Sequence, residues 1–253
     1  MASNQTCPIF FDRLEVSNFL GNVEISGPIL SGSCLGRQSS LRFDKIDASL
    51  SLPTLSPPGI KIHVKLTDGK SLINLYPVIS YPKASFEINQ TYIDGVFLEK
   101  LLGGAFKVFG KIKLESQMDI ENGDLLEGNF SLVSTDFTVP QQNISGFNIP
   151  ALLLRNLGIK GTVSEKNIIN FSNIILGDNS SVIFAQLSGK LKLNKGYFQE
   201  SIMELTGKLK LTKSFLTSFP ILNLLLSGKT PGPDGMYNLK LQGPISSLKP
   251  TIF

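Results

Sequence analysis

The feature that most constrains this chain is a strict alternation of lysine with leucine or isoleucine in three five-residue repeats. The repeats are Gly110–Leu114 (GKIKL), Gly189–Leu193 (GKLKL) and Gly207–Leu211 (GKLKL). Successive side chains of a β-strand point to opposite faces, so each repeat places its lysines on one face and its apolar residues on the other. The uneven spacing of the repeats excludes a solenoid of fixed period and indicates one type of strand that the chain reuses.

The composition agrees with a folded, sheet-rich chain. Of the 253 residues, 42% are hydrophobic and 17% are charged, which is enough apolar material to form a core. Seventeen phenylalanines and no tryptophan, together with many branched aliphatic residues, favour strands over a helix bundle.

Most of the chain shows the two-residue period of strands, separated by glycine- and asparagine-rich turns. Three apolar segments break that rhythm and are predicted as short helices: 93–102, 149–157 and 214–226. Because helices do not alternate one-for-one with strands, a doubly wound parallel sheet is excluded. The prediction is a mainly β fold, a large curved antiparallel meander that forms a trough or a sandwich, with about three short apolar helices. We expect one domain over residues 8–253, preceded by an appended or disordered segment, residues 1–7.

The net charge of +4 does not indicate a nucleic-acid-binding protein, because the lysines occur singly and no basic run is interleaved with aromatics. A solvated sheet face explains them, and it remains compatible with mild attraction to anionic lipid head groups. The two cysteines, Cys7 and Cys34, permit one disulfide in an oxidising compartment, and the sequence leaves their pairing open.

The residues that chemistry would require are scarce. A single histidine, His63, and two cysteines cannot form the usual zinc sites, and no phosphate-binding, dinucleotide-binding or calcium-binding motif is present. The segment 32–36 (GSCLG) has the outline of a nucleophile elbow, but a strand follows where an elbow needs a helix. The prediction is a protein that is not an enzyme and has no cofactor and no metal.

Function therefore depends on what covers the leucine face of the repeated strands. In one alternative a second sheet or the predicted helices cover it, giving an ordinary core. In the other the apolar face stays partly open to lipid tails or to a partner's strand. The residues predicted to contact a partner or lipid come from the repeats and from two predicted helices: Leu152, Leu153, Leu191, Leu193, Leu209, Leu211, Leu216, Phe219 and Leu222.

The order of motifs in residues 145–250 resembles the type II secretion system protein N (GspN-type) family of Gram-negative bacteria, and the first half of the chain resembles it only in general character. The matching segments are 149–154 (IPALLL), 157–161 (LGIKG), 173–178 (NIILGD), 189–193 (GKLKL), 207–211 (GKLKL) and 234–244 (DGMYNLKLQGP), with Pro250 beyond. Family members resemble, more remotely, the AsmA-like β-rich periplasmic proteins.

This resemblance implies a non-enzymatic periplasmic component of a type II secretion system that supports protein export across the outer membrane. It implies contacts with other secretion-apparatus proteins or with the membrane, and an inner-membrane anchor supplied by a segment outside this sequence. The alternative that it implies is an AsmA-like module that binds or bridges lipid through an apolar groove. No active-site residue is carried over, because the matching motifs are glycines and prolines.

Overall fold

The computed structural model describes residues 9–17, 21–31, 40–51, 53–55, 58–101, 104, 106–144, 147–195, 197–218, 222 and 226–253. Its main feature is one large sheet in which fourteen strands follow one another as neighbours, in the order β2-β3-β6-β8-β9-β10-β11-β12-β15-β16-β17-β18-β19-β20. Every neighbouring pair is antiparallel. The predicted mainly β, antiparallel meander is confirmed.

The strands of this path lengthen from the N-terminal edge to the middle and shorten again towards the C-terminal edge. They are β2 (Arg13–Ser17), β3 (Asn22–Ser26), β6 (Lys45–Leu50), β8 (Pro58–Asp68), β9 (Ser71–Ser80), β10 (Lys83–Asp94), β11 (Lys111–Glu121), β12 (Asp124–Val139), β15 (Leu152–Glu165), β16 (Ile168–Leu176), β17 (Ile183–Lys192), β18 (Ile202–Leu211), β19 (Tyr237–Pro244) and β20 (Lys249–Ile252).

Short elements complete the fold. The strands β1 (Ile9–Phe10), β4 (Ile29–Leu30) and β5 (Leu41–Arg42) form a small sheet, β13 (Gln142–Ile144) pairs with β14 (Phe147–Ile149), and β7 (Thr54–Leu55) pairs with β8. In the described residues the named helices are α1 (Gly95–Leu101) and α2 (Lys213–Ser218), with short 3-10 turns at Phe198–Glu200 and Ile245–Ser247. No helix in the described part of the chain is long and apolar enough to cross a membrane.

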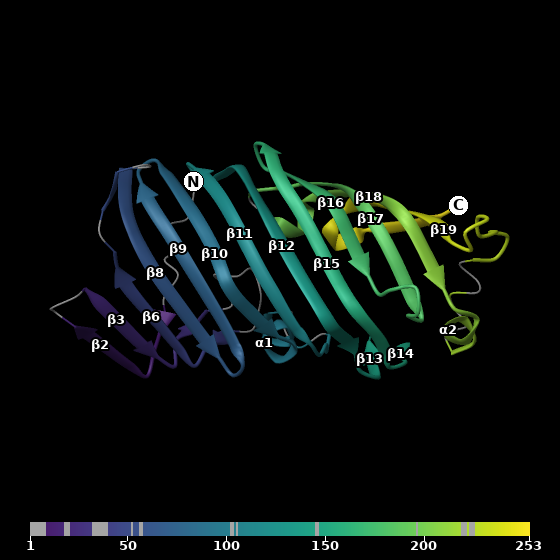
Figure 1. Ribbon diagram of the computed structural model, residues 1–253, viewed down its shortest axis with the longest axis horizontal. Coiled ribbons are helices and arrows are strands. Elements are labelled where there is room, and N and C mark those ends of the chain that lie inside the picture. Colours follow the sequence, from purple (N-terminus) through teal and green to yellow (C-terminus); the bar gives the residue numbers. More distant parts are fainter. Residues whose placement is uncertain are drawn as a thin grey trace.

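The large sheet is strongly curved. In Figure 1 the long strands β8 to β15 face the viewer, and β18 and β19 bend round so that the C-terminal strands lie behind the middle of the sheet. The helices α1 and α2 and the hairpin β13-β14 all lie along the lower edge in this view. The sheet therefore has a concave side, turned towards its own C-terminal strands, and a convex side that faces the viewer.

The glycines of the repeats explain part of this curvature. A Cβ atom on Gly207 would lie 2.0 Å from the backbone oxygen of Gln186 on β17. A Cβ on Gly189, whose φ is +149°, would lie 2.0 Å from the backbone oxygen of Glu204 on β18. These two strands pair along their full length, so only glycine lets their backbones approach so closely at both points.

The predicted helix at 149–157 is wrong. That stretch contains the end of β14 and the start of β15, separated by Pro150 and Ala151. Leu152 and Leu154 are buried, whereas Leu153 between them is 57% exposed, which is the alternation of a strand. Strand geometry prevails because β15 completes hydrogen-bonded ladders with β12 on one side and β16 on the other.

The other two helix predictions fare better. The helix predicted at 93–102 is confirmed as α1, and it begins where the side chain of Asp94 accepts a hydrogen bond from the backbone N–H of Phe97 at 2.9 Å. The helix predicted at 214–226 is confirmed over its first turn and a half as α2. Residues 219–221 and 223–225 lie outside the described part of the chain.

Candidate functional site

The candidate site is the apolar side of the large sheet, which a single row of facing residues traces from one edge to the other. In the N-terminal half the ladders place Leu14, Ile25, Ile46, Leu66 and Ile73 opposite one another on successive strands. From β11 to β20 the row continues through Leu114, Leu132, Ile159, Ile174, Leu187, Gly207, Leu239 and Ile252. We call this set the apolar row, and the side of the sheet that holds it the apolar face.

Thr91 joins the two halves of the row. It lies opposite Leu114 at the point where a bulge interrupts the pairing of β10 with both of its neighbours. Its side chain is completely buried, and its hydroxyl oxygen accepts a hydrogen bond from the backbone N–H of Asn74 at 2.9 Å. A buried polar group needs such a partner, so the threonine preserves the continuity of the face without an unsatisfied backbone donor.

One end of the apolar face is closed. The main core cluster joins residues from the ends of the central strands to α1, to the segment after β5 and to α2; its most buried members include Ile112, Leu154 and Phe97. The ring of Phe43 packs 5.9 Å from that of Phe97. Lys100 on α1 donates to Asp68 at 2.6 and 2.8 Å, which ties the helix to the turn between β8 and β9.

The opposite end and the N-terminal strands are open to solvent. Ile60 and Ile79 face each other across β8 and β9 and are 54% and 49% exposed. Leu50 is 57% exposed on β6, and Leu14 and Val16 are 47% and 57% exposed on β2. All five side chains belong to the apolar face by register. The face is therefore closed at one end of the strands and exposed at the other.

A cavity of about 770 Å³ lies at the same end of the strands, mostly on the polar side of the sheet. Ala84, which pairs with the exposed Ile79, is part of its wall. The remaining wall mixes apolar and charged side chains from the ends of the central hairpins: Pro58, Val78, Ser80, Lys83, Ser85, Asp119, Ile120, Leu126, Glu127 and Ser164.

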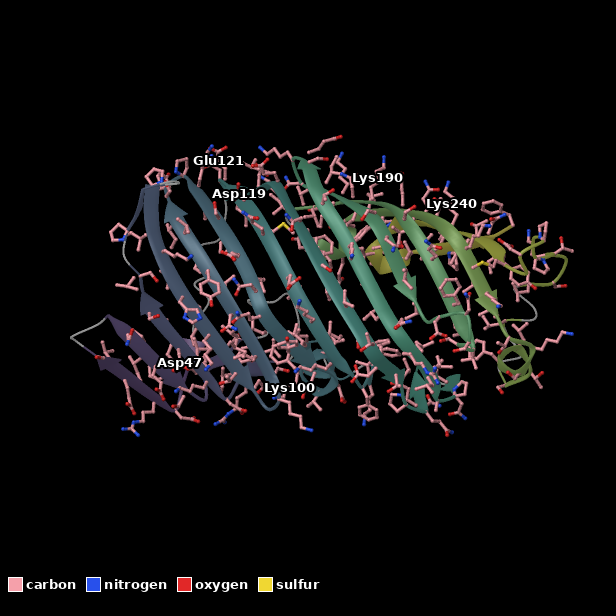
Figure 2. The ribbon with its side chains drawn as sticks, viewed as in Figure 1. Asp47, Lys100, Asp119, Glu121, Lys190 and Lys240 are labelled. Carbon is pink, nitrogen blue, oxygen red and sulfur yellow. The ribbon has the colours of Figure 1, made fainter. Side chains whose placement is uncertain are left out.

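The other side of the sheet is polar, as the lysine alternation predicts. Figure 2 labels five of its charged residues, from strands spread along the sheet: Asp47, Asp119, Glu121, Lys190 and Lys240. In the repeats themselves, Lys190 and Lys192 are exposed while Leu191 between them is buried. The lysines of the repeats therefore lie on the solvated side, and they do not line the apolar face.

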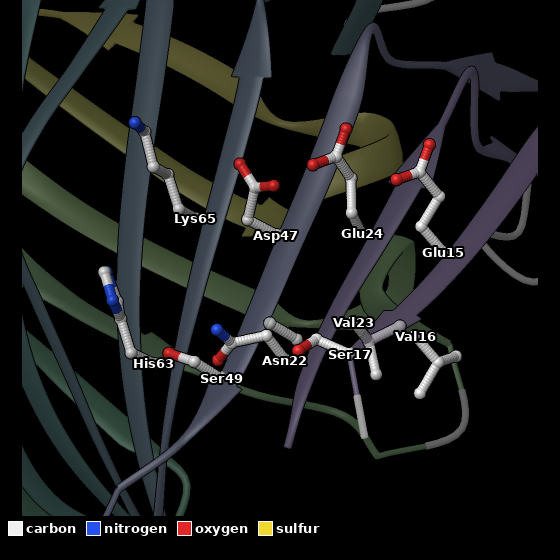
Figure 3. A pocket seen from close by; sticks show the side chains of 11 residues that line it. Glu15, Val16, Ser17, Asn22, Val23, Glu24, Asp47, Ser49, His63 and Lys65 are labelled. Atoms are coloured by element: carbon white, nitrogen blue, oxygen red, sulfur yellow. The ribbon is translucent and has the colours of Figure 1, made fainter. Parts of the chain in front are cut away.

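A second cavity, of about 510 Å³, lies on the polar side of the N-terminal strands (Figure 3). Glu15, Glu24, Asp47 and Lys65 form one row across four strands in this view. The ammonium of Lys45 lies 2.8 Å from Glu24 and 2.9 Å from Asp47, and these carboxylates raise the pKa of Lys45 above its ordinary value, Glu24 most strongly. Since Arg13 also lies 2.8 Å from Glu15, each carboxylate has a cation and the row is an ordinary charged sheet surface.

An ion cluster around the buried carboxylate of Asp124 joins the hairpin turns. Asp124 begins β12 and is 3% exposed; its carboxylate pairs with Lys166 and Lys195 and accepts a hydrogen bond from the Asn167 amide at 2.7 Å. The hydrogen bonds from Lys166, Lys195 and Asn167, in that order of size, hold the pKa of Asp124 well below its usual range. Three turns that are distant in sequence, all at the same end of the strands, are therefore joined by the carboxylate of Asp124.

The predicted contact residues divide between the core and the surface. Leu152 and Leu191 are buried, Leu153 is exposed on strand β15, and five others are half-buried: Leu193, Leu209, Leu211, Leu216 and Leu222. Phe219 lies outside the described residues, as do Cys7, Cys34 and the GSCLG segment. The leucines of the repeats are thus mostly covered, so they are not the open part of the apolar face.

Sequence reasoning did not select Leu50, Ile60 and Ile79, the residues that form the open part. Each stands at the end of an alternating segment, beside the proline-rich stretch 53–58 or before the turn at Tyr81 and Pro82. Their position at strand ends was the only sequence signal of exposure, because the ends of strands are the last parts of a sheet face to be covered. The sequence does not show which end the helices cover.

Metal-binding groups do not gather in the described part of the chain. No three His, Cys, Asp or Glu side chains there are close enough to hold a metal ion. The ring of His63 stacks on Tyr76 with centroids 4.5 Å apart, and its Nε2 lies 3.5 Å from the side-chain oxygen of Asn74. A tyrosine ring and an amide position the histidine on the polar face, and neither provides it with a nucleophile to activate.

Comparison with known proteins gives no match to a family model, to a curated protein or to a solved structure.

Proposed function

We propose that this chain is a non-enzymatic protein that binds the acyl chains of lipids on the open end of its apolar face. The observation that supports this most is the exposure of Leu50, Ile60 and Ile79 on an apolar face whose opposite end is covered. Contiguous exposed aliphatic side chains are unfavourable in water and mark a surface that has a ligand or a partner.

The arrangement of the exposed aliphatic side chains suits a single extended chain. Ile60, Ile79 and Ala84 face one another on β8, β9 and β10, so a hydrocarbon chain could lie across these three strands along their aliphatic side chains. Each CH₂ group removed from water contributes about 0.8 kcal/mol, so eight groups contribute about 6 kcal/mol before the cost of ordering the chain. Lys83, at the turn between β9 and β10, is a cation at the same end of the strands, near which an acidic head group could lie.

The test is binding of a fluorescent fatty acid, cis-parinaric acid, to the purified chain, together with mass spectrometry of lipids extracted from it. We expect saturable binding, weakened at least tenfold by Ile79→Glu, because a carboxylate would then lie on the apolar face. The matched control is Ser80→Glu, whose side chain points to the polar side of the same strand, and it should leave the affinity unchanged. Absence of both saturable binding and co-purifying lipid would reject the proposal.

A second candidate function rests on the motifs of residues 145–250: a periplasmic component of a type II secretion system, anchored to the inner membrane and in contact with other proteins of the apparatus. Most of the motif glycines stand at positions that need them. Gly177, for example, has a φ of +79°, and a Cβ there would lie 2.1 Å from the backbone oxygen of Ile183. Such requirements support a backbone shared with the family that these motifs resemble. They do not identify the protein partners, which experiment must find.

Deletion of the gene in its host tests this second function. If it is right, type II substrates accumulate inside the cell while other secreted proteins are exported normally, and a plasmid copy restores export. Fractionation should then recover the protein with the inner membrane, exposed to protease from the periplasmic side only. Normal export in the deletion strain would reject it and would leave the lipid proposal standing.

A further inference from the structure

The N-terminal edge of the large sheet is unusually apolar for an unpaired edge. On its edge strand β2, Leu14 and Val16 are 47% and 57% exposed. Just before this strand, Ile9, Phe10 and Phe11 are also exposed, and the first two of them belong to the small sheet. Among the described residues, β2 is paired on one side only, with β3. A free edge with exposed apolar side chains is a template for pairing with another strand.

The C-terminal edge is protected by contrast. Its strand β20 contains Lys249 and Pro250, both of which discourage pairing. Phe253 and Asn238 exchange backbone hydrogen bonds of 3.0 and 3.2 Å. Because alternate residues of a strand bond to the same neighbour, Thr251 and Lys249 also direct their backbone groups towards β19. Pro250 therefore stands at an outward position, where it removes a donor from the free edge. A head-to-tail assembly of copies through both edges is disfavoured.

We propose that two copies of this chain associate through their β2 edges, antiparallel and about a two-fold axis, with Leu14 facing Leu14 of the second copy. An axis perpendicular to the sheet keeps both apolar faces on the same side, which requires even-numbered residues to face even-numbered ones. The combined sheet would then have β20 at both of its outer edges, so the assembly closes as a dimer.

Charge selects this register among the neighbouring ones. With Leu14 at the axis, Arg13 of each copy faces Glu15 of the other, which gives two opposite-charge pairs. Moving the axis to Glu15 places two carboxylates directly opposite each other, and moving it to Arg13 does the same with two guanidinium groups, and both arrangements are destabilising. The sequence RLEVS is therefore self-complementary in one register only.

Sedimentation equilibrium over a concentration series is the first test, because a five-residue strand gives a small interface that exchanges with monomer. We expect a monomer–dimer equilibrium. Arg13→Glu and Glu15→Arg should each raise the dimer Kd at least tenfold, and the double variant should restore it. Thr251→Lys, on the opposite edge, is the matched control and should leave it unchanged. A monomer at every concentration, or a double variant no better than the single ones, would overturn the proposal.

A cysteine cross-link tests the register directly. In a background with Cys7→Ser and Cys34→Ser, oxidation of Leu14→Cys should give a covalent dimer on a non-reducing gel. Val16→Cys should not, because the two copies of residue 16 are offset by four residues, about 13 Å along the strands, which is beyond the reach of a disulfide. Circular dichroism confirms that both variants fold. Cross-linking through residue 16 and not through residue 14 would reject this register.

Discussion

The N-terminal and C-terminal halves of the large sheet have the same apolar pattern and opposite exposure. In β17 to β19, Leu187, Leu205 and Leu239 form a cluster of their own, each at most 9% exposed, covered by side chains of neighbouring strands. In β6 to β9, Leu50, Ile60 and Ile79 lie on the same face, at the open end of the strands, and are about half exposed. The two halves also differ in curvature: the C-terminal strands curve behind the middle of the sheet, and the N-terminal strands do not (Figure 1).

This difference teaches that an alternating strand specifies which side is apolar and does not specify whether that side is covered. Hydrophobic stabilisation follows the area removed from water, so equivalent residues in the two halves should contribute very differently to stability. Four experiments test or refine that comparison, and they follow in order of decreasing expected effect.

The largest effect should come from truncating the closed end. Leu154→Ala removes a side chain that is 2% exposed within the main core cluster and should lower the free energy of unfolding by about 3 kcal/mol. Ile60→Ala, at the open end, should cost less than about 1 kcal/mol. Urea denaturation monitored by circular dichroism measures both. Equal losses would show that the two ends of the face do not differ in burial.

A somewhat smaller loss is expected from the glycine that lets β17 and β18 approach. In Gly207→Ala the new methyl group would meet the backbone oxygen of Gln186, and relieving that clash should cost about 2 kcal/mol. Gly123→Ala is a useful comparison, because nothing lies within 4 Å of a Cβ there and only its positive φ is unfavourable. If both variants are equally stable in urea, close approach does not explain the repeat glycines.

Acid should weaken the ion cluster that joins the hairpin turns. Because the pKa of Asp124 is lowered in the folded state, its stabilising contribution is complete above the unfolded value near 4 and is lost as pH falls from there towards the folded value. Asp124→Asn should therefore destabilise the protein at pH 6 and flatten the decline in stability between pH 4 and pH 2. Thermal unfolding at a series of pH values measures this, and parallel curves for variant and wild type would contradict it.

The smallest effect on stability should accompany a large effect on binding. Ile79→Ser replaces a half-exposed side chain, so the free energy of unfolding should change by less than about 0.5 kcal/mol while the affinity for cis-parinaric acid falls. Leu187→Ser in the covered half should do the reverse, destabilising the fold through a buried hydroxyl. Loss of binding only when the fold is lost would place the ligand elsewhere.

Much of the sheet could be read from local pattern. The repeats at 110–114, 189–193 and 207–211 were predicted as strands with lysine outside, and the structure has them at the start of β11, the end of β17 and the end of β18. The turns at Gly69, Asn122 and Gly123 were also predicted from the sequence, because the positive φ of these residues is a local requirement. The α1 helix was predicted from its spacing and its following glycines.

The failures arose where local signals favoured the wrong element. The segment 149–157 has a proline and a run of three leucines and is followed by a glycine, a pattern that suits a helix. Its strand conformation depends on β12 and β16, which supply hydrogen-bonded partners from elsewhere in the chain. The leucines of the repeats that were predicted to contact a partner do lie on the apolar face. Most of them are covered, because the curvature of the sheet decides which part of that face is buried.

The sequence by itself determined that this chain forms antiparallel strands with one polar and one apolar side, because alternation is a property of neighbouring residues. Tertiary structure alone decided that the C-terminal strands curl over the apolar face, that α1 and the core close one end of it, and that Leu50, Ile60 and Ile79 remain exposed. Those outcomes depend on contacts between residues far apart in the chain, whose distances no local pattern contains.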